Sequence, residues 1–160
     1  MPVYTRIIAA FLAVYALAVP VSANEAIILK QDDAPIRIDW YKANHKSTGR
    51  AGVISHRVSV TALTENSVQA FALGFHVFDA FDRNMDKPFF GYHMERLAAG
   101  AEQSAVWEQN ARDSFTFTRY GTGVVYVAIA RLFDGTIWKA DEVDIQLQLE
   151  DLEFELNQFE

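Results

Sequence analysis

The chain has 160 residues, of which 51% are hydrophobic and 22% charged, and this is the balance of an ordinary globular protein with room for one domain. Its formal net charge of −7 disfavours nucleic acid and anionic lipid surfaces as partners, because both would repel it. The absence of cysteine excludes disulfides and a bacterial lipid anchor, so the fold must rest on apolar burial.

Residues 1–23 have the organisation of a secretory signal peptide. Arg6 precedes an apolar stretch that runs from 7 to 19, and Val21-Ser22-Ala23 supplies the small residues that signal peptidase needs. The stretch is shorter than the roughly 20 residues that a membrane-spanning helix requires. We therefore expect cleavage before Asn24, a periplasmic or secreted protein, and no stable membrane anchor.

From Asn24 to Ala140 the apolar residues recur with a period of two, and turn residues interrupt them. This pattern is typical of short antiparallel strands in a sandwich or barrel. Asn44–Gly52 and Asp82–Lys87 are polar and predict loops, and Gly100 marks a turn. The predicted strands are Ala26–Lys30, Ile36–Lys42, Val53–Leu63, Val68–Asp79, Phe89–Leu97, Ala105–Gln109, Phe115–Tyr120, Val124–Phe133 and Thr136–Ala140.

Two neighbouring strands are predicted to form a hairpin. Thr64–Ser67, a four-residue turn-forming stretch, joins Val53–Leu63 to Val68–Asp79. A hairpin centred on this turn would place all the large apolar residues on one face. The expected cross-strand pairs are Val58 with Leu73, Val60 with Phe71, and His56 with Phe75.

The longest apolar run after the leader is Val124–Phe133, which predicts a central strand buried on both sides. Asp134-Gly135 follows it directly. Both residues accept a positive φ, so this pair predicts a type I′ hairpin that leads into the returning strand.

Residues 141–160 change character. Ile145, Leu149, Leu152, Leu156 and Phe159 are spaced by 4, 3, 4 and 3 residues, which predicts an amphipathic helix capped by Asp141. Over the shorter stretch 143–149 the apolar residues also alternate, and this fits a strand equally well. In either form the segment presents apolar side chains that need cover, on or beside the domain.

One strand carries a family resemblance. Phe75-His76-Val77-Phe78-Asp79 resembles the F-x-L-Y-D signature of small bacterial exported domains of immunoglobulin-like topology, with Val and Phe replacing Leu and Tyr. Leu97-Ala98-Ala99-Gly100 matches the L-x-x-G turn that follows in those domains. The likeness covers roughly Val58 to Val106.

The resemblance implies an immunoglobulin-like antiparallel β-sandwich over residues 24–140. It also implies an adhesive or accessory role in the cell envelope, with no catalytic residue to transfer. Within the motif, Phe75 and Val77 should point inward, and Asp79 should end the strand by accepting hydrogen bonds from backbone amides of the following turn.

Four oxygen-bearing side chains gather at the end of that strand, and the last three of them alternate, as ligands do in calcium loops. A complete loop would have Gly at its sixth position and Glu at its twelfth, where this chain has Lys87 and His93. A solvated loop is the simpler interpretation, and calcium is the alternative. The four residues are Asp79, Asp82, Asn84 and Asp86.

The histidines do not predict a zinc site. No two of them have the i+2 to i+5 spacing of local metal sites, and in the expected register His56 and His76 point to opposite faces. We expect half-buried structural histidines instead. The four are His45, His56, His76 and His93.

No nucleophilic centre is recognisable either. The chain has no G-x-S-x-G elbow, and Ser55 and His56 are adjacent in a strand, so their side chains point apart. Glu95, Asp113 or Asp134 could pair as glycosidase carboxylates, but any acidic protein offers such pairs. We therefore expect no enzyme activity, no catalytic residues, and no cofactor or metal.

The aromatic residues are the remaining candidates for binding. Most should fill the core, and a few could join the C-terminal apolar stripe in a surface that recruits another envelope protein. The candidate surface residues are Trp40, Tyr41, Trp107, Trp138, Leu149, Leu152, Leu156 and Phe159.

The leading hypothesis is a non-catalytic exported module that binds another protein. The alternative is a sandwich that binds a small molecule or carbohydrate on exposed Trp and Tyr. A concave pocket with convergent polar groups would favour the ligand binder, and a flat apolar patch over the last 20 residues would favour the protein partner.

Overall fold

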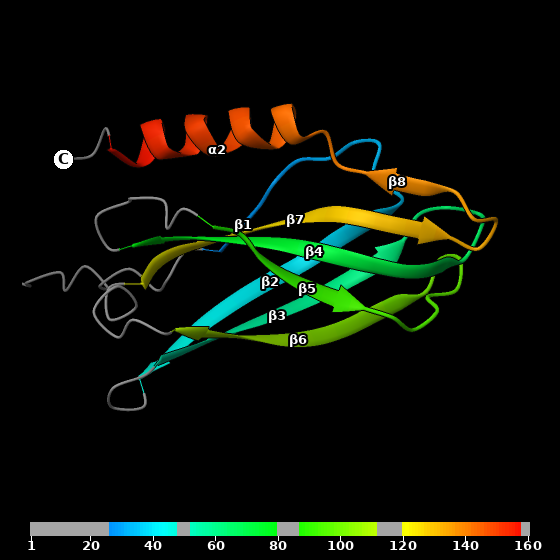
Figure 1. The fold of residues 1–160 in the computed structure, drawn as a ribbon, viewed down its shortest axis with the longest axis horizontal. Helices are drawn as coiled ribbons and strands as arrows, with labels where there is room; N and C mark the ends of the chain where they lie inside the picture. The colour runs from blue at the N-terminus through cyan, green and yellow to red at the C-terminus, as the bar shows by residue number, and fades with distance from the viewer. Residues whose placement is uncertain (1–25, 48–51, 80–86, 112–119, 158–160) are drawn as a thin grey trace, which may run out of the picture.

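The structure is a computed structural model, and it describes residues 26–47, 52–79, 87–111 and 120–157. Two sheets pack face to face, and one helix lies along the outside of the larger sheet (Figure 1). The elements are β1 (Ala26–Ile28), β2 (Ile36–Ser47), β3 (Gly52–Ala62), β4 (Val68–Asp79), β5 (Phe89–His93), β6 (Glu102–Ala111), β7 (Tyr120–Leu132), β8 (Ile137–Lys139) and α2 (Glu142–Asn157).

The larger sheet has the strand order β1-β7-β4-β5, with β8 also paired to β7, and the smaller sheet has the order β2-β3-β6. All pairings are antiparallel except that of β1 with β7. Within the described ranges, no helix has both the length and the apolar character needed to cross a membrane.

Most of the predicted strands are confirmed, with shifted ends. Val68–Asp79 is found as predicted, whereas β2 continues to Ser47, into the stretch predicted as a loop, and β5 already ends at His93. The predicted leader 1–23 lies outside the described residues. Residues 82–86 of the predicted loop 82–87 and residues 115–119 of the predicted strand 115–120 also lie outside the described residues.

The predicted hairpin of β3 with β4 is wrong. β3 pairs with β2 and β6, and β4 pairs with β5 and β7, so Thr64–Ser67 carries the chain from one sheet to the other. The two strands face each other across the interior, where the rings of His56 and Phe75 stack at 4.3 Å. A hairpin and a crossover both satisfy the same alternation, because each puts every second side chain on the buried face.

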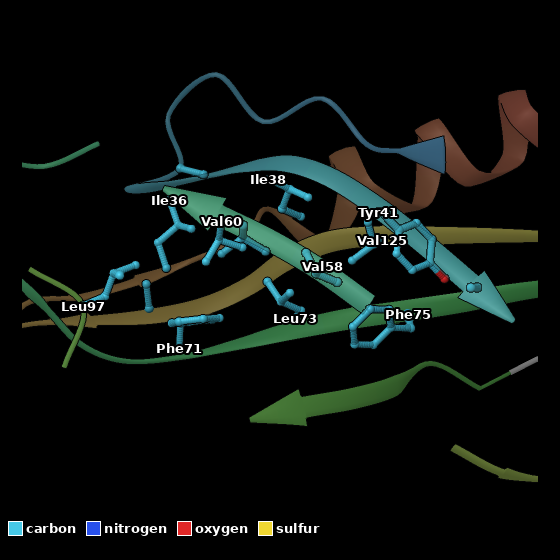
Figure 2. Close-up of a cluster of buried hydrophobic side chains, with 14 of the residues drawn as sticks. Ile36, Ile38, Tyr41, Val58, Val60, Phe71, Leu73, Phe75, Leu97 and Val125 are labelled. Carbon is cyan, nitrogen blue, oxygen red and sulfur yellow. The ribbon is translucent and has the colours of Figure 1, made fainter. Parts of the chain in front are cut away.

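The main core fills the space between the sheets (Figure 2). Phe71, Leu73, Phe75 and Val77 all point into it from β4, which confirms the predicted apolar face. Facing them from the smaller sheet are Ile36, Ile38, Tyr41, Val58 and Val60.

β2 changes phase at a β-bulge between Ile38 and Trp40. An inserted residue reverses the alternation of every later side chain. Ile38 before the bulge and Tyr41 after it are therefore both buried, while Trp40 points outward.

The Asp134-Gly135 hairpin is confirmed, but its turn is not type I′. Arg131 pairs with Ile137, which leaves a loop of three residues between the flanking Leu132 and Thr136. The Gly135 amide donates to the Leu132 carbonyl at 3.1 Å, and Gly135 has φ +89°. This is the three-residue loop in which glycine takes the left-handed position.

The C-terminal segment is a helix, as the apolar spacing predicts. The Asp141 carboxylate accepts hydrogen bonds from the Val143 and Asp144 amides at 2.9 and 3.4 Å, which confirms the predicted cap. Ile145 and Leu149 form a second core on the outer face of the larger sheet, with Leu29, Phe78, Val124 and Tyr126. β7 is thus buried on both faces from Thr122 to Val127, which confirms the first part of the predicted central strand 124–133, whereas Arg131 and Phe133 near its end are exposed.

Candidate binding groove

A groove of about 520 Å³ lies on the outer face of the larger sheet, between α2 and the edge strand β5. This volume is in the range of small-molecule sites. It is lined by Ala72, His76, Pro88, Phe90, Tyr92, Tyr126, Ala128, Ile129, Lys139, Ala140, Glu142, Ile145, Gln146 and Leu149.

The floor of the groove is low because small residues form it. Ala72 and Ala128 line it from the two central strands of the sheet. Gly74 faces the same side, and the ring of Tyr126 lies over it so closely that a Cβ atom there would overlap the ring. Larger side chains at these positions would fill the space between the helix and β5.

The first wall is aromatic and comes from β5. Tyr92 pairs with Ala72 and Phe90 pairs with Gly74, so both rings rise beside the floor. The wall is held at its free edge by Trp107 of β6, whose indole N–H donates to the Tyr92 carbonyl at 3.1 Å. The Trp107 ring also packs directly over Gly91, where a Cβ would come within 2.7 Å of it.

The second wall is the first half of α2, together with the end of β8. Ile145 and Leu149 supply apolar surface, and Glu142 and Gln146 supply polar groups one turn apart. Lys139 adds a cation to the same rim. Apolar surface and hydrogen-bonding groups therefore converge on one space.

The most buried polar side chains that line the groove are His76 and Tyr126. Their rings stack with centroids 6.0 Å apart, and both side chains are buried. Burial raises the pKa of Tyr126, and the nearby Glu142 carboxylate raises it further. Tyr126 is therefore a neutral hydroxyl at physiological pH, able to donate and to accept a hydrogen bond.

A separate polar cluster lies inside the main core. The Tyr41 hydroxyl is 2.9 Å from His56 Nδ1, and Gln109 Oε1 is 3.0 Å from His56 Nε2. Burial lowers the pKa of His56 to about 4, against a smaller opposing effect of the Gln109 hydrogen bond. Burial also raises the pKa of Tyr41 and Tyr120 far above the usual value. Because all these groups are neutral and enclosed, we assign the cluster a structural role.

The residues predicted for an interaction surface do not gather in one place. Tyr41 and Leu149 are buried in two different cores. Trp40 is exposed on β2, Trp107 packs against the main core and over Gly91 of β5, and the Trp138 indole donates to Asp33 at 3.1 Å. Leu152 packs against the second core, while nothing is described of the Leu156 side chain or of Phe159.

The remaining candidates for chemistry are dispersed. His45 and His56 lie in the smaller sheet, and His76 and His93 in the larger one. Of the suggested calcium ligands, Asp79 is buried at the end of β4, and the other three lie outside the described residues. In the part of the chain that the structure describes, no three metal-binding side chains come together.

The groove was not predicted from the sequence, although the strand and the helix that form its two walls were. One signal was present: Ala70, Ala72 and Gly74 alternate with Phe71, Leu73 and Phe75 along β4. A strand with large residues on one face and small residues on the other predicts a shallow outer surface. Its pairing with β5, which completes the groove, is a long-range relationship that the local pattern does not contain.

The fold and the groove define a mostly β protein of sandwich-like form, with two sheets and one C-terminal helix. It is similar to a solved hypothetical protein from Peptoclostridium difficile 630, with a TM-score of 0.52 and 10% identity, covering 74% of this chain and 92% of that one. A Northeast Structural Genomics Consortium target matches with a TM-score of 0.48 and 12% identity, covering 68% of this chain and 81% of that one. No protein-family model and no curated protein matches the sequence.

Proposed function

We propose that this chain is an exported, non-catalytic binding module of the bacterial envelope, and that it binds a small amphipathic ligand in the groove between α2 and β5. The observation that carries the proposal is the groove itself, where aromatic, aliphatic and polar side chains converge on about 520 Å³. This favours the small-molecule alternative over a purely protein-binding role for the same surface.

The lining suggests the chemistry of the ligand. Phe90 and Tyr92 offer exposed flat faces for stacking, and the largely buried Ile145 and Leu149 form the apolar base of the opposite wall. Lys139 and Glu142 carry opposite charges on the rim. A neutral or zwitterionic molecule with a planar apolar part and a few hydrogen-bonding substituents fits this combination best.

The strand order supports an immunoglobulin-like topology. If β2 to β8 are taken as strands A, B, C, C′, E, F and G, the smaller sheet reads A-B-E and the larger sheet reads G-F-C-C′. These are the neighbours expected for an immunoglobulin-type sandwich. Under this assignment the F-x-L-Y-D-like segment is strand C, with Phe75 and Val77 in the core.

Export and the lack of catalysis rest on the sequence. The leader at 1–23 supports export, and the absence of cysteine and of a nucleophile elbow supports a binding role. An adhesive or accessory function, as in the domains that the motif resembles, is compatible with a ligand groove.

The experiment is a fluorescence titration of the purified protein, expressed from the full chain, with the neutral aromatic probe N-phenyl-1-naphthylamine. Saturable enhancement is expected, and Tyr92→Ala should weaken it about three- to tenfold, since aromatic contacts contribute about 0.5–1.5 kcal/mol. Met94→Ala is the matched control, because Met94 is exposed just beyond β5 but does not line the groove. No saturable binding, or equal effects of the two variants, would contradict the proposal.

A further inference from the structure

The helix α2 has two apolar stripes, and only one of them packs against other parts of the chain that the structure describes. Ile145 and Leu149 face the sheet with 6% and 2% exposure. Val143, Leu147 and Phe154 are 68%, 54% and 66% exposed. At 3.6 residues per turn, these three residues fall within about 40° of arc, on the side opposite to Ile145 and Leu149.

The outer stripe is not needed to hold the helix in place. The inner side chains belong to the second core, and Gln148 fixes the helix laterally by accepting from the Lys30 amide and donating to the Lys30 carbonyl, both at 3.0 Å. None of the three outer residues lines the groove. Three large apolar side chains thus stand in line on the solvent side of an anchored helix. Figure 1 shows that α2 itself lies along the outside of the larger sheet.

The charges beside the stripe limit what can cover it. α2 has no basic residue, and its six acidic residues lie on both flanks of the stripe, with Glu150 nearest to it. A second copy of this chain would bring the same negative charge against it, and an anionic membrane would do likewise. The acidic residues are Glu142, Asp144, Glu150, Asp151, Glu153 and Glu155.

We propose that the outer stripe of α2, defined as Val143, Leu147 and Phe154, docks a basic amphipathic segment of another protein. The apolar side chains of that segment would cover the stripe, and its Lys and Arg residues would face the acidic flanks. The interaction is of the helix-in-groove or helix-pairing kind, in which apolar anchors at helical spacing carry the affinity.

The test is fluorescence polarisation of the full protein with a labelled synthetic peptide whose Leu residues recur at helical spacing and whose other positions are Lys or Arg. A peptide of the same pattern with Glu in place of the basic residues is the comparison. The double variant Leu147→Gln/Phe154→Gln should weaken binding of the basic peptide about tenfold or more. Val106→Gln, an equally exposed apolar position on β6, is the matched control and should leave binding unchanged.

A second pair of measurements separates charge from apolar contact. Glu150→Lys/Asp151→Lys should weaken binding of the basic peptide and reduce its dependence on salt, because it reverses one charge on each side of the stripe. Light scattering should show the same mass for the parent protein and the double Gln variant. The proposal would be overturned if the basic peptide did not bind, or if the acidic peptide bound equally well. It would also be overturned if the parent protein self-associated and the double Gln variant did not. Binding of N-phenyl-1-naphthylamine should be unchanged in the double Gln variant, so this test and that of the groove fail independently.

Discussion

The Tyr41 hydroxyl lies 2.9 Å from Nδ1 of His56, in the interior between the two sheets. On the other side of the ring, Gln109 Oε1 lies 3.0 Å from Nε2. An amide oxygen only accepts, so Nε2 carries the proton and the Tyr41 hydroxyl donates to Nδ1. The two hydrogen bonds together hold a neutral imidazole in one tautomer, and they join β2, β3 and β6 through side chains.

This arrangement predicts a pH-dependent stability. Burial lowers the pKa of His56 to about 4, from 6.5 in an ordinary environment. Between these values the unfolded chain binds a proton that the folded chain does not. The free energy of unfolding should therefore fall as the pH drops from about 6.5 to about 4, with a total contribution from His56 of about 3 kcal/mol. Urea denaturation across this range measures it.

Carboxylates also titrate in that range, so the contribution of His56 is isolated by difference. His56→Gln removes the titrating group, and its stability should vary less steeply with pH than that of the parent protein between pH 4 and 6.5. Parallel pH profiles for the two proteins would show that His56 does not have a lowered pKa.

Removing the Tyr41 hydroxyl tests the same pair from the other side. Tyr41→Phe keeps the ring in the core but leaves the buried Nδ1 of His56 without the donor described above. An unsatisfied buried acceptor costs about 1–3 kcal/mol. Tyr92→Phe, at an exposed ring on β5, should change the free energy of unfolding by less than about 0.5 kcal/mol. Chemical denaturation measures the free energy of unfolding of both variants. Equal stabilities of the two variants would contradict the hydrogen bond from the Tyr41 hydroxyl to His56.

The two stripes of α2 predict opposite responses to truncation. Leu149→Ala should lower the free energy of unfolding by about 2–5 kcal/mol, because Leu149 is almost fully buried in the second core. Leu147→Ala, two residues earlier on the exposed side, should cost less than about 0.5 kcal/mol. Thermal and urea unfolding provide the comparison. A large cost for Leu147→Ala would mean that the helix packs in a different rotation.

The left-handed glycine in the β7–β8 turn gives a further prediction. Gly135 has φ +89°, and a Cβ there meets no neighbouring atom within 4 Å, so any cost of substitution is conformational. Gly135→Ala should cost about 1–2 kcal/mol, and Gly135→Asn less, because Asn visits the left-handed region more readily. The denaturation midpoint of Gly135→Ala should therefore be lower than that of Gly135→Asn. Equal midpoints for the two variants would contradict this turn geometry.

The local features of the fold were predictable from sequence, whereas the partners of the strands were not. The alternation along Val68–Asp79 located β4 and its buried face, because period two is a property of a single strand. It could not distinguish a hairpin with β3 from a crossover between sheets, since both bury the same residues. The bulge before Trp40 similarly exchanged the environments of Trp40 and Tyr41, and an inserted residue has no signature in the alternation on either side of it.

The candidate groove escaped prediction for a related reason. Its floor is made of residues that are merely small, such as Ala72 and Ala128, and small residues draw no attention in a search for reactive groups. The helix was the reverse case. The Asp141 cap and the 4-3-4-3 spacing indicated it, but Val143 and Leu147 of the exposed stripe belonged to the alternation over 143–149 that also suggested a strand, and Phe154 belonged to neither pattern.

The most direct test of the account is a titration of the isotopically labelled protein with N-phenyl-1-naphthylamine, followed by amide NMR. If the groove is the ligand site, the largest shift changes should fall on Phe90, Tyr92, Gln146 and their neighbours, with the exposed face of the smaller sheet unaffected. Shift changes confined to β2, β3 and β6, or none at saturating probe, would contradict the assignment of the groove as the binding site.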